Sequence, residues 1–107
     1  MLYELRIYDA MPGKLPQLHK RFADHTLGMW KKHGIQVVGM WTDEIGVTNR
    51  ITYILGYRDL ADREKRWAAF ITDPDWVRVR AESEKDGPLL AHATNTIMRP
   101  TPYSPMQ

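Results

Sequence analysis

The sequence predicts an α+β fold in which helices cover one face of a four-stranded antiparallel sheet. Segments that alternate apolar and polar residues, as half-buried strands do, occur near both ends and in the middle of the chain. Segments with apolar residues at helical spacing lie between them. With 107 residues, the chain is long enough for one domain with one hydrophobic core.

The first half of the chain supplies a strand, a helix and a second strand. Residues 2–8 alternate strictly, which predicts the first strand. Apolar residues at helical spacing predict a helix over residues 15–33, and Gly34 suits the left-handed position that follows a helix. Residues 35–45 are rich in Val, Ile, Met and Trp, which predicts the second strand.

The second half repeats this order after a hairpin loop at residues 46–49. The patterns predict a strand over 50–57, helices over 60–72 and 74–85, a strand over 92–98 and an extended tail over 100–107. Asp73 suits the N-cap of the second of these helices, and Pro74 suits its first position. The order strand, helix, strand, strand, helix, strand is that of a ferredoxin-like sheet, and residues 1–107 form a single domain.

The two faces of the predicted sheet differ in polarity. We expect the helices to cover Tyr3, Leu5 and Ile7 on the first strand, while Ile51, Tyr53, Leu55 and Tyr57 share one face of the third. Glu4, Arg6 and Tyr8 would then lie on the uncovered face. Because the second and third strands carry few charges, that face would still be largely apolar. We therefore expect two copies to pack sheet against sheet, with Glu4 and Arg6 paired across a homodimer interface.

Composition argues against several classes of function. There is no cysteine, and therefore no disulfide or thiolate metal site. Basic residues alternate with acidic ones, which is typical of a solvated surface, so we expect no nucleic-acid partner. Glu4 lies close to the start and no apolar run approaches the roughly 18 residues of a membrane span, so we expect a cytoplasmic protein without a membrane partner.

No metal site or cofactor site is expected. The four histidines are scattered, and none forms a pair with helix-ligand spacing. No glycine-rich phosphate loop is present. A haem site would need an axial histidine, for which His25 and His92 are the candidates.

The segment 63–76 holds the densest group of aromatic residues in the chain. Trp67 and Phe70 share a helix face, and Trp76 follows in the first turn of the next helix. Two interpretations stay open: these rings fill the core, or they line an apolar pocket between sheet and helices. The pocket interpretation takes its site residues as Trp41, Asn49, Tyr53, Arg63, Trp67, Phe70 and Trp76.

His25 is the candidate catalytic residue, because it lies three residues after Phe22, toward the apolar stripe of the first helix. In a dry pocket it would act as a general base, with Tyr53 and Asn49 as hydrogen-bond donors. Arg63 would hold a substrate carboxylate at the mouth. Both His25 and Arg63 also have a purely structural interpretation. His25 would then be a core or rim histidine, and Arg63 would form a surface or interface ion pair.

Several short motifs resemble those of the NIPSNAP family over almost the whole chain. They are Tyr3-Glu4-Leu5-Arg6-x-Tyr8, Pro12-Gly13, His33-Gly34-Ile35, Val38-Gly39-x-Trp41, Ile45-Gly46-x-x-Asn49, Arg63-Glu64-x-x-Trp67-x-x-Phe70, Asp73-Pro74-x-Trp76 and Pro100-Thr101-x-Tyr103-Ser104. The resemblance implies the dimeric α+β barrel superfamily, which includes cofactor-independent oxygenases, isomerases and haem enzymes. It implies no catalytic set, because the NIPSNAP branch is largely uncharacterised.

Two functions from different classes remain. The preferred one is a homodimer that binds a small, mostly apolar molecule, with cofactor-independent oxygenase or isomerase activity as an open option. The other is a non-catalytic interaction or scaffold domain. The scaffold alternative predicts that Trp67, Phe70, Met29 and Trp30 fill the space between sheet and helices, whereas the pocket interpretation predicts a cavity of a few hundred Å³.

Overall fold

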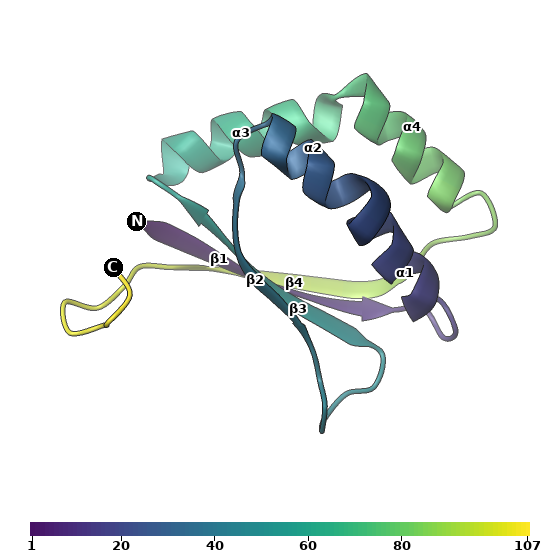
Figure 1. Cartoon of the computed structure of the whole chain (residues 1–107), viewed down its shortest axis with the longest axis horizontal. Helices are drawn as coiled ribbons and strands as arrows, with labels where there is room; N and C mark the ends of the chain where they lie inside the picture. The colour runs from purple at the N-terminus through teal and green to yellow at the C-terminus, as the bar shows by residue number, and fades with distance from the viewer.

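Four antiparallel strands form one sheet in the order β2-β3-β1-β4, and all helices lie on one of its faces (Figure 1). The computed structural model describes residues 1–107. The strands are β1 (Leu2–Ala10), β2 (Gln36–Thr42), β3 (Arg50–Tyr57) and β4 (Leu90–Met98). This is the arrangement expected of a ferredoxin-like sheet, and the fold prediction is confirmed.

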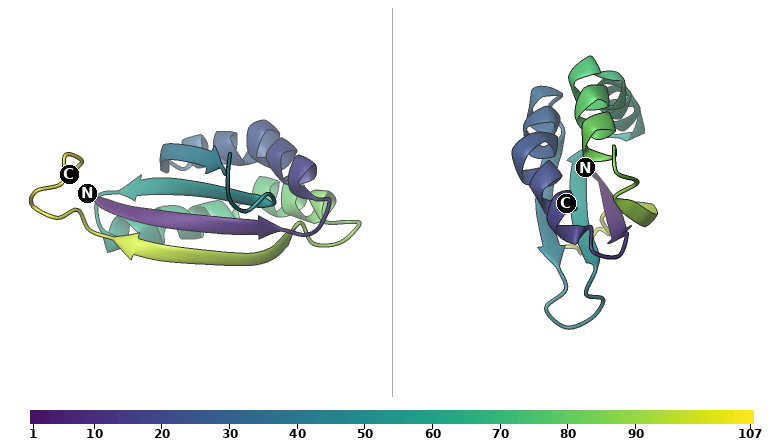
Figure 2. Two further views of the ribbon diagram at one scale, coloured as in Figure 1. Left: turned by 90° about the horizontal axis from the view of Figure 1, so that it is seen from below. Right: turned by 90° about the vertical axis from the view of Figure 1, so that its right-hand side faces the viewer.

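The helices form two rods that run over the same face of the sheet (Figure 2). One consists of α1 (Leu15–Arg21), the π-helical segment η1 (Phe22–Thr26) and α2 (Leu27–Lys32). The other consists of α3 (Leu60–Thr72) and α4 (Pro74–Ser83). The sequence predicted the first rod as one helix, and the π-helical turn in its middle is the difference. None of these helices has the length and apolar character needed to cross a membrane.

Asp73 begins α4 and also ties that helix to the end of α2. Its side chain accepts a hydrogen bond from the backbone N–H of Asp75, with Pro74 in the first turn, as the sequence predicted. The same carboxylate accepts from Lys32 Nζ at 2.7 Å and contacts His33 Nε2 at 2.8 Å. The hydrogen bonds from Lys32 and His33 hold the pKa of Asp73 far below its ordinary value.

The polarity of β1 is the reverse of the expectation. Glu4 and Tyr8 are buried beneath the helices, and Arg6 lies on the same face, whereas Leu5 and Ile7 are on the open face. The prediction that the helices cover Tyr3, Leu5 and Ile7 was therefore wrong. The physical reason is that the charged side chains find partners within the same chain, which offset the desolvation cost of burying them beneath the helices.

In the third strand, Ile51, Tyr53, Leu55 and Tyr57 share one face, as predicted. This face turns out to be the one beneath the helices, and the four residues are at most 2% exposed. Across the sheet they lie opposite the even-numbered residues of β1, so the two central strands contribute one continuous buried face.

The open face of the sheet carries half of the apolar and aromatic side chains of β1, namely Tyr3, Leu5 and Ile7. Leu5 lies opposite Ile54 on β3, and Ile7 lies opposite Thr52. Trp41 on β2 is opposite the same Thr52 and is 52% exposed. No helix covers this face (Figure 2), so a broad apolar surface faces outward.

Candidate functional site

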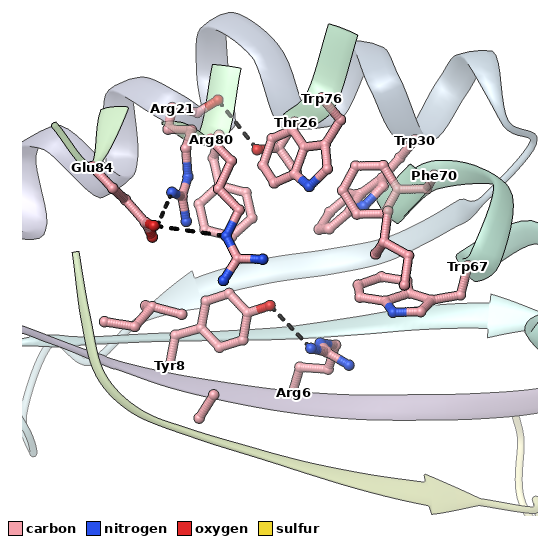
Figure 3. A pocket seen from close by; sticks show the side chains of 14 residues that line it. Arg6, Tyr8, Arg21, Thr26, Trp30, Trp67, Phe70, Trp76, Arg80 and Glu84 are labelled. Atoms are coloured by element: carbon pink, nitrogen blue, oxygen red, sulfur yellow. Dashed lines mark hydrogen bonds and ion pairs between the residues drawn. The ribbon is translucent and has the colours of Figure 1, made fainter. Parts of the chain in front are cut away.

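A cavity of about 270 Å³ lies between the sheet and the two helical rods (Figure 3). Its floor comes from β1 and β4, and its walls come from the end of α1, from η1 and α2, and from α3 and α4. Almost every residue of β4 is exposed, so the helices leave this side of the sheet uncovered. We call this space the aromatic cavity.

Six rings line the aromatic cavity: Tyr8, Phe22, Trp30, Trp67, Phe70 and Trp76. The ring centroids of Trp67 and Phe70 are 5.1 Å apart, and those of Phe70 and Trp76 are 4.8 Å apart. The helix is interrupted at Asp73, between α3 and α4. This interruption produces the second contact, because it turns Trp76 back toward Phe70. The rings hold one another in edge and tilted contacts, which makes the wall rigid.

Arg6 projects from β1 beneath this wall (Figure 3). Its Nε donates to the hydroxyl of Tyr53 at 2.8 Å, its Nη2 to the hydroxyl of Tyr8 at 3.1 Å and its Nη1 to Glu4 at 2.8 Å. The guanidinium carbon lies 4.5 Å from the ring centroid of Trp67, within the range of a cation–π contact. Burial raises the pKa of the Tyr53 phenol well above its ordinary value, so this hydroxyl keeps its proton.

Glu4 is the buried counter-ion of two arginines. Arg63 on α3 donates from Nε to Oε1 and from Nη2 to Oε2, each at 3.0 Å, and Arg6 donates to Oε2. Asn95 on β4 donates to the same carboxylate at 2.9 Å. Burial alone would raise the pKa of Glu4, but the hydrogen bonds from Arg63 and Asn95 and the charge of Arg6 outweigh it and hold that pKa below its ordinary value.

A second charged group closes the other end of the aromatic cavity. Arg21 is only 7% exposed, donates to Ser83 Oγ at 3.1 Å and lies 5.5 Å from the ring centroid of Trp76. Glu84 lies between two guanidiniums, 3.4 Å from Arg21 Nη1 and 3.7 Å from Arg80 Nε. Both arginines line the cavity with Glu84.

The π-helical turn explains how the first rod reaches the aromatic cavity. Arg21 and Thr26 both line it although they are five residues apart, a spacing that one π turn brings onto the same side. The hydroxyl of Thr26 donates to the backbone carbonyl of Arg21 at 3.3 Å, which gives that carbonyl a hydrogen-bond partner in the widened turn. π-Helical turns of this kind are frequent at functional sites.

The structure brings together part of the set of site residues expected from the sequence. Trp67, Phe70 and Trp76 line the aromatic cavity. Tyr53 is fully buried behind them and reaches the cavity through its bond with Arg6. Arg63 does not line the cavity; its guanidinium binds Glu4, which in turn binds Arg6.

Three other expected residues lie elsewhere. His25 is exposed on η1 and lines a separate shallow depression. Trp41 lies on the open face of the sheet. Asn49 donates to the backbone carbonyls of Ala10 and Met11 at the end of the hairpin, which is a structural role.

The histidines do not gather at the cavity. None of its lining residues is a histidine, so the two haem-ligand candidates, His25 and His92, are both outside it. No three His, Asp or Glu side chains lie together in a way that would hold a metal ion.

Sequence reasoning missed the polar half of the site. Arg6 and Tyr8 were assigned to the opposite face, Arg80 was counted among the solvated surface charges, and Arg21 was not considered. Trp30 was considered only as a filler of the core. One signal was available: Phe22, Thr26 and Trp30 recur at four-residue intervals, which places them on one helix face.

Comparison with known proteins matches nearly the whole chain to one protein family. The family model described as NIPSNAP matches residues 3–105. Protein NipSnap homolog 2 of Danio rerio is 28% identical over 106 residues, which cover 99% of this chain and 35% of that protein. The chain thus spans about a third of the length of this curated relative.

Solved structures of similar proteins have the same fold. A NIPSNAP family protein with unknown function from Agrobacterium tumefaciens is 34% identical, with 100% of this chain and 94% of that chain covered and a TM-score of 0.86. A putative antibiotic biosynthesis monooxygenase from Nitrosomonas europaea is 11% identical, with 94% and 98% covered and a TM-score of 0.66. At that identity the likeness concerns the fold alone.

Proposed function

The chain belongs to the NIPSNAP family, and on this basis we propose that it is a homodimeric protein that binds a small, mostly apolar molecule in the aromatic cavity. The observation that carries the proposal is the cavity itself, about 270 Å³ in volume and lined by six aromatic rings. Ligand sites are typically concave, mainly apolar and equipped with a few polar groups, and this cavity has all three properties.

The cavity separates this proposal from a purely structural domain. A scaffold domain would have the space between sheet and helices filled by side chains. Here Trp30 is buried and Phe70 is 2% exposed, so both are well packed on one side. Both nevertheless also line the open space, together with Trp67. This geometry favours a binding role over the scaffold alternative.

The open face of the sheet supports the homodimer. With the polarity of β1 as observed, Leu5, Ile7 and Ile54 lie together on a face without helices. Trp41 at its edge is half exposed, and its ring lies against Gly39, where a side chain would collide with it. A second copy placed sheet to sheet would bury these apolar groups, which is the main driving force of such associations. Glu4 and Arg6 have no part in this interface, because both lie on the helix side.

Oxygenase or isomerase chemistry is a further step that needs a proton acceptor at the ligand. The only carboxylate that lines the cavity, Glu84, is held between Arg21 and Arg80. His25 lies outside. We therefore restrict the proposal to binding, and catalysis stays a prediction from the family resemblance.

Filling the aromatic cavity tests the proposal directly. Ala93 on β4 lines the cavity, so Ala93→Phe should occupy it. Ala91 is exposed in the same strand but does not line the cavity, so Ala91→Phe adds the same ring outside it. Calorimetric titration with naphthalene-2-carboxamide, a neutral planar probe, should show binding to the wild type and to Ala91→Phe and lost binding to Ala93→Phe. No binding to the wild type, or equal binding to all three proteins, would contradict the proposal.

A further inference from the structure

The charges around the aromatic cavity do not balance. Three of the residues that line it, Arg6, Arg21 and Arg80, are cationic, and Glu84 alone is anionic. Glu84 is shared between Arg21 and Arg80, so it offsets only one of them. At the other end, Arg6 has Glu4 as its partner, and Arg63, which shares Glu4, is also paired with Glu64 at 2.6 Å, so that end is balanced. The end formed by Arg21 and Arg80 therefore keeps one uncompensated positive charge, which would attract an anion.

The free hydrogen-bonding groups at the cavity are mainly donors. Arg6 uses three of its five N–H groups on Glu4, Tyr8 and Tyr53, which leaves two. The hydroxyl of Tyr8 accepts from Arg6, and its own proton stays available to a ligand. Such a site selects a molecule that brings acceptors.

Trp30 supplies the most specific of these donors. Its side chain is 1% exposed and lines the cavity, and its indole Nε1–H finds no acceptor in the protein. A buried donor without a partner costs free energy, because it has lost its hydrogen bond to water. Nε1 itself has almost no accessible surface, so a ligand oxygen that pairs with it must displace a neighbouring side chain of the wall, and would then remove that cost. Buried polar groups without a partner are uncommon in proteins, and this one belongs to a side chain that lines a cavity.

Two of the three cations are held in place before any ligand arrives. Arg6 lies over the ring of Trp67 and Arg21 lies near the ring of Trp76, at 4.5 and 5.5 Å from the respective centroids. Figure 3 shows Arg6 on the sheet side of the cavity and Arg80 on the helix side, with the indole of Trp67 beside Arg6. Little side-chain entropy would be lost when an anion binds between groups that are already positioned.

We propose that the aromatic cavity takes a small planar organic acid. This inference rests on the proposed function and names the class of ligand for the same site. The flat body of the acid packs against Trp67, Phe70 and Trp76, its anionic group meets Arg6 and Arg80, and one of its oxygens accepts from Trp30 Nε1. Charge and the unpartnered donor together distinguish this ligand from a neutral apolar molecule.

Three probes that share one ring system test the inference: naphthalene-2-carboxylate, naphthalene-2-carboxamide and 2-naphthylmethylammonium. Calorimetric titration should show the carboxylate binding about tenfold more tightly than the amide, with the ammonium compound weakest. The preference for the carboxylate should shrink with added salt, because part of it is charge attraction.

A matched pair of variants on α4 locates the effect. Arg80 and Arg78 are each 64% exposed, but only Arg80 lines the cavity. Arg80→Gln should weaken carboxylate binding about threefold and leave amide binding unchanged, while Arg78→Gln should change neither.

The outcomes separate this inference from the proposal on which it rests. If the carboxylate and the amide bind equally well, or if the ammonium compound binds best, the anion inference is overturned and the apolar binding site stands. Equal losses in Arg80→Gln and Arg78→Gln would also overturn it, because the effect would then be one of net charge. If none of the three probes binds, both the inference and the proposed function fail.

Discussion

Glu4 on β1 and Arg63 on α3, 59 residues apart in sequence, form a bidentate ion pair with both N–O distances at 3.0 Å. The carboxylate is inaccessible to solvent and the arginine side chain is 16% exposed. The pair joins the sheet to α3. It also sets the position of Arg6, which donates to the same carboxylate. It therefore links the stability of the fold to the geometry of the aromatic cavity.

Glu4→Gln should destabilise the protein by about 3 kcal/mol, because it removes the buried counter-ion that Arg6 and Arg63 share and leaves Arg6 without one. The measurement is the free energy of unfolding from urea denaturation. Glu64→Gln is the matched control, since Glu64 pairs with the same Arg63 at 2.6 Å but is 71% exposed. The control should cost less than about 1 kcal/mol. Equal effects of the two substitutions would show that burial of the Glu4 pair contributes nothing.

The pH dependence of stability should carry the signature of Glu4. Its pKa is lower in the folded protein than the ordinary value of 4.5. Its contribution is therefore complete above the unfolded-state pKa and is lost as the pH falls through the folded-state pKa. In urea denaturation between pH 7 and pH 3, wild type and Glu64→Gln should lose stability more steeply than Glu4→Gln. Parallel profiles for all three proteins would contradict this assignment.

Leu5→Lys should separate the proposed dimer. Leu5 lies between Ile54 and Thr96 on the open face, so two lysines would be forced into one apolar contact. Light scattering should give twice the 12.5 kDa chain mass for the wild type and a single chain mass for the variant. Leu60→Lys, at a 52% exposed position on the helix side, should leave the mass unchanged. A wild-type protein of single chain mass at high concentration would refute the dimer.

Gly34→Ala should destabilise the protein by about 1–2 kcal/mol, because Gly34 has a φ of +70° and follows α2 in the left-handed region. A methyl group there would also collide with the guanidinium of Arg66, which donates to the carbonyl of His33. Gly28→Ala is the control: it is helical with open space around it, and alanine should stabilise by about 0.5–1 kcal/mol. Thermal unfolding of both variants checks the opposite signs, and a stabilising Gly34→Ala would be contrary to this account.

The sequence patterns were sufficient for the elements and their order. The strand over residues 50–57 and the helix over 60–72 begin and end where the periodicity placed them. The second strand ends at Thr42, earlier than predicted, because Asp43 turns back to accept a hydrogen bond from the backbone of Val47. The family resemblance was also confirmed, because the matching residues extend over nearly the whole chain.

The inward face of β1 could not be deduced from β1 alone. A period of two separates two faces but does not state which one is covered. The partners that allow Glu4 to be buried, Arg63 and Asn95, are 59 and 91 residues away in sequence. Apolar residues also occupied the other face, so hydrophobicity gave the wrong answer.

The candidate site was only half predictable for a related reason. Trp67 and Phe70 lie on a regular helix, so their common face followed from their spacing. Arg21 comes before the π-helical turn and Trp30 comes after it. The turn changes how the two parts of the rod are rotated relative to each other. The sequence analysis predicted one regular helix there and so did not bring Arg21 to the aromatic cavity.

The indole N–H signals of the protein give the most direct test of the central claim, that an organic acid binds beside Trp30. Four tryptophans give four such signals in a proton–nitrogen correlation spectrum, and Trp30→Phe identifies the one from Trp30. On titration with naphthalene-2-carboxylate, the Trp30 signal should move downfield as its unpartnered N–H gains an acceptor, while the signal of Trp41 on the open face stays still. A stationary Trp30 signal at saturating probe would contradict the account.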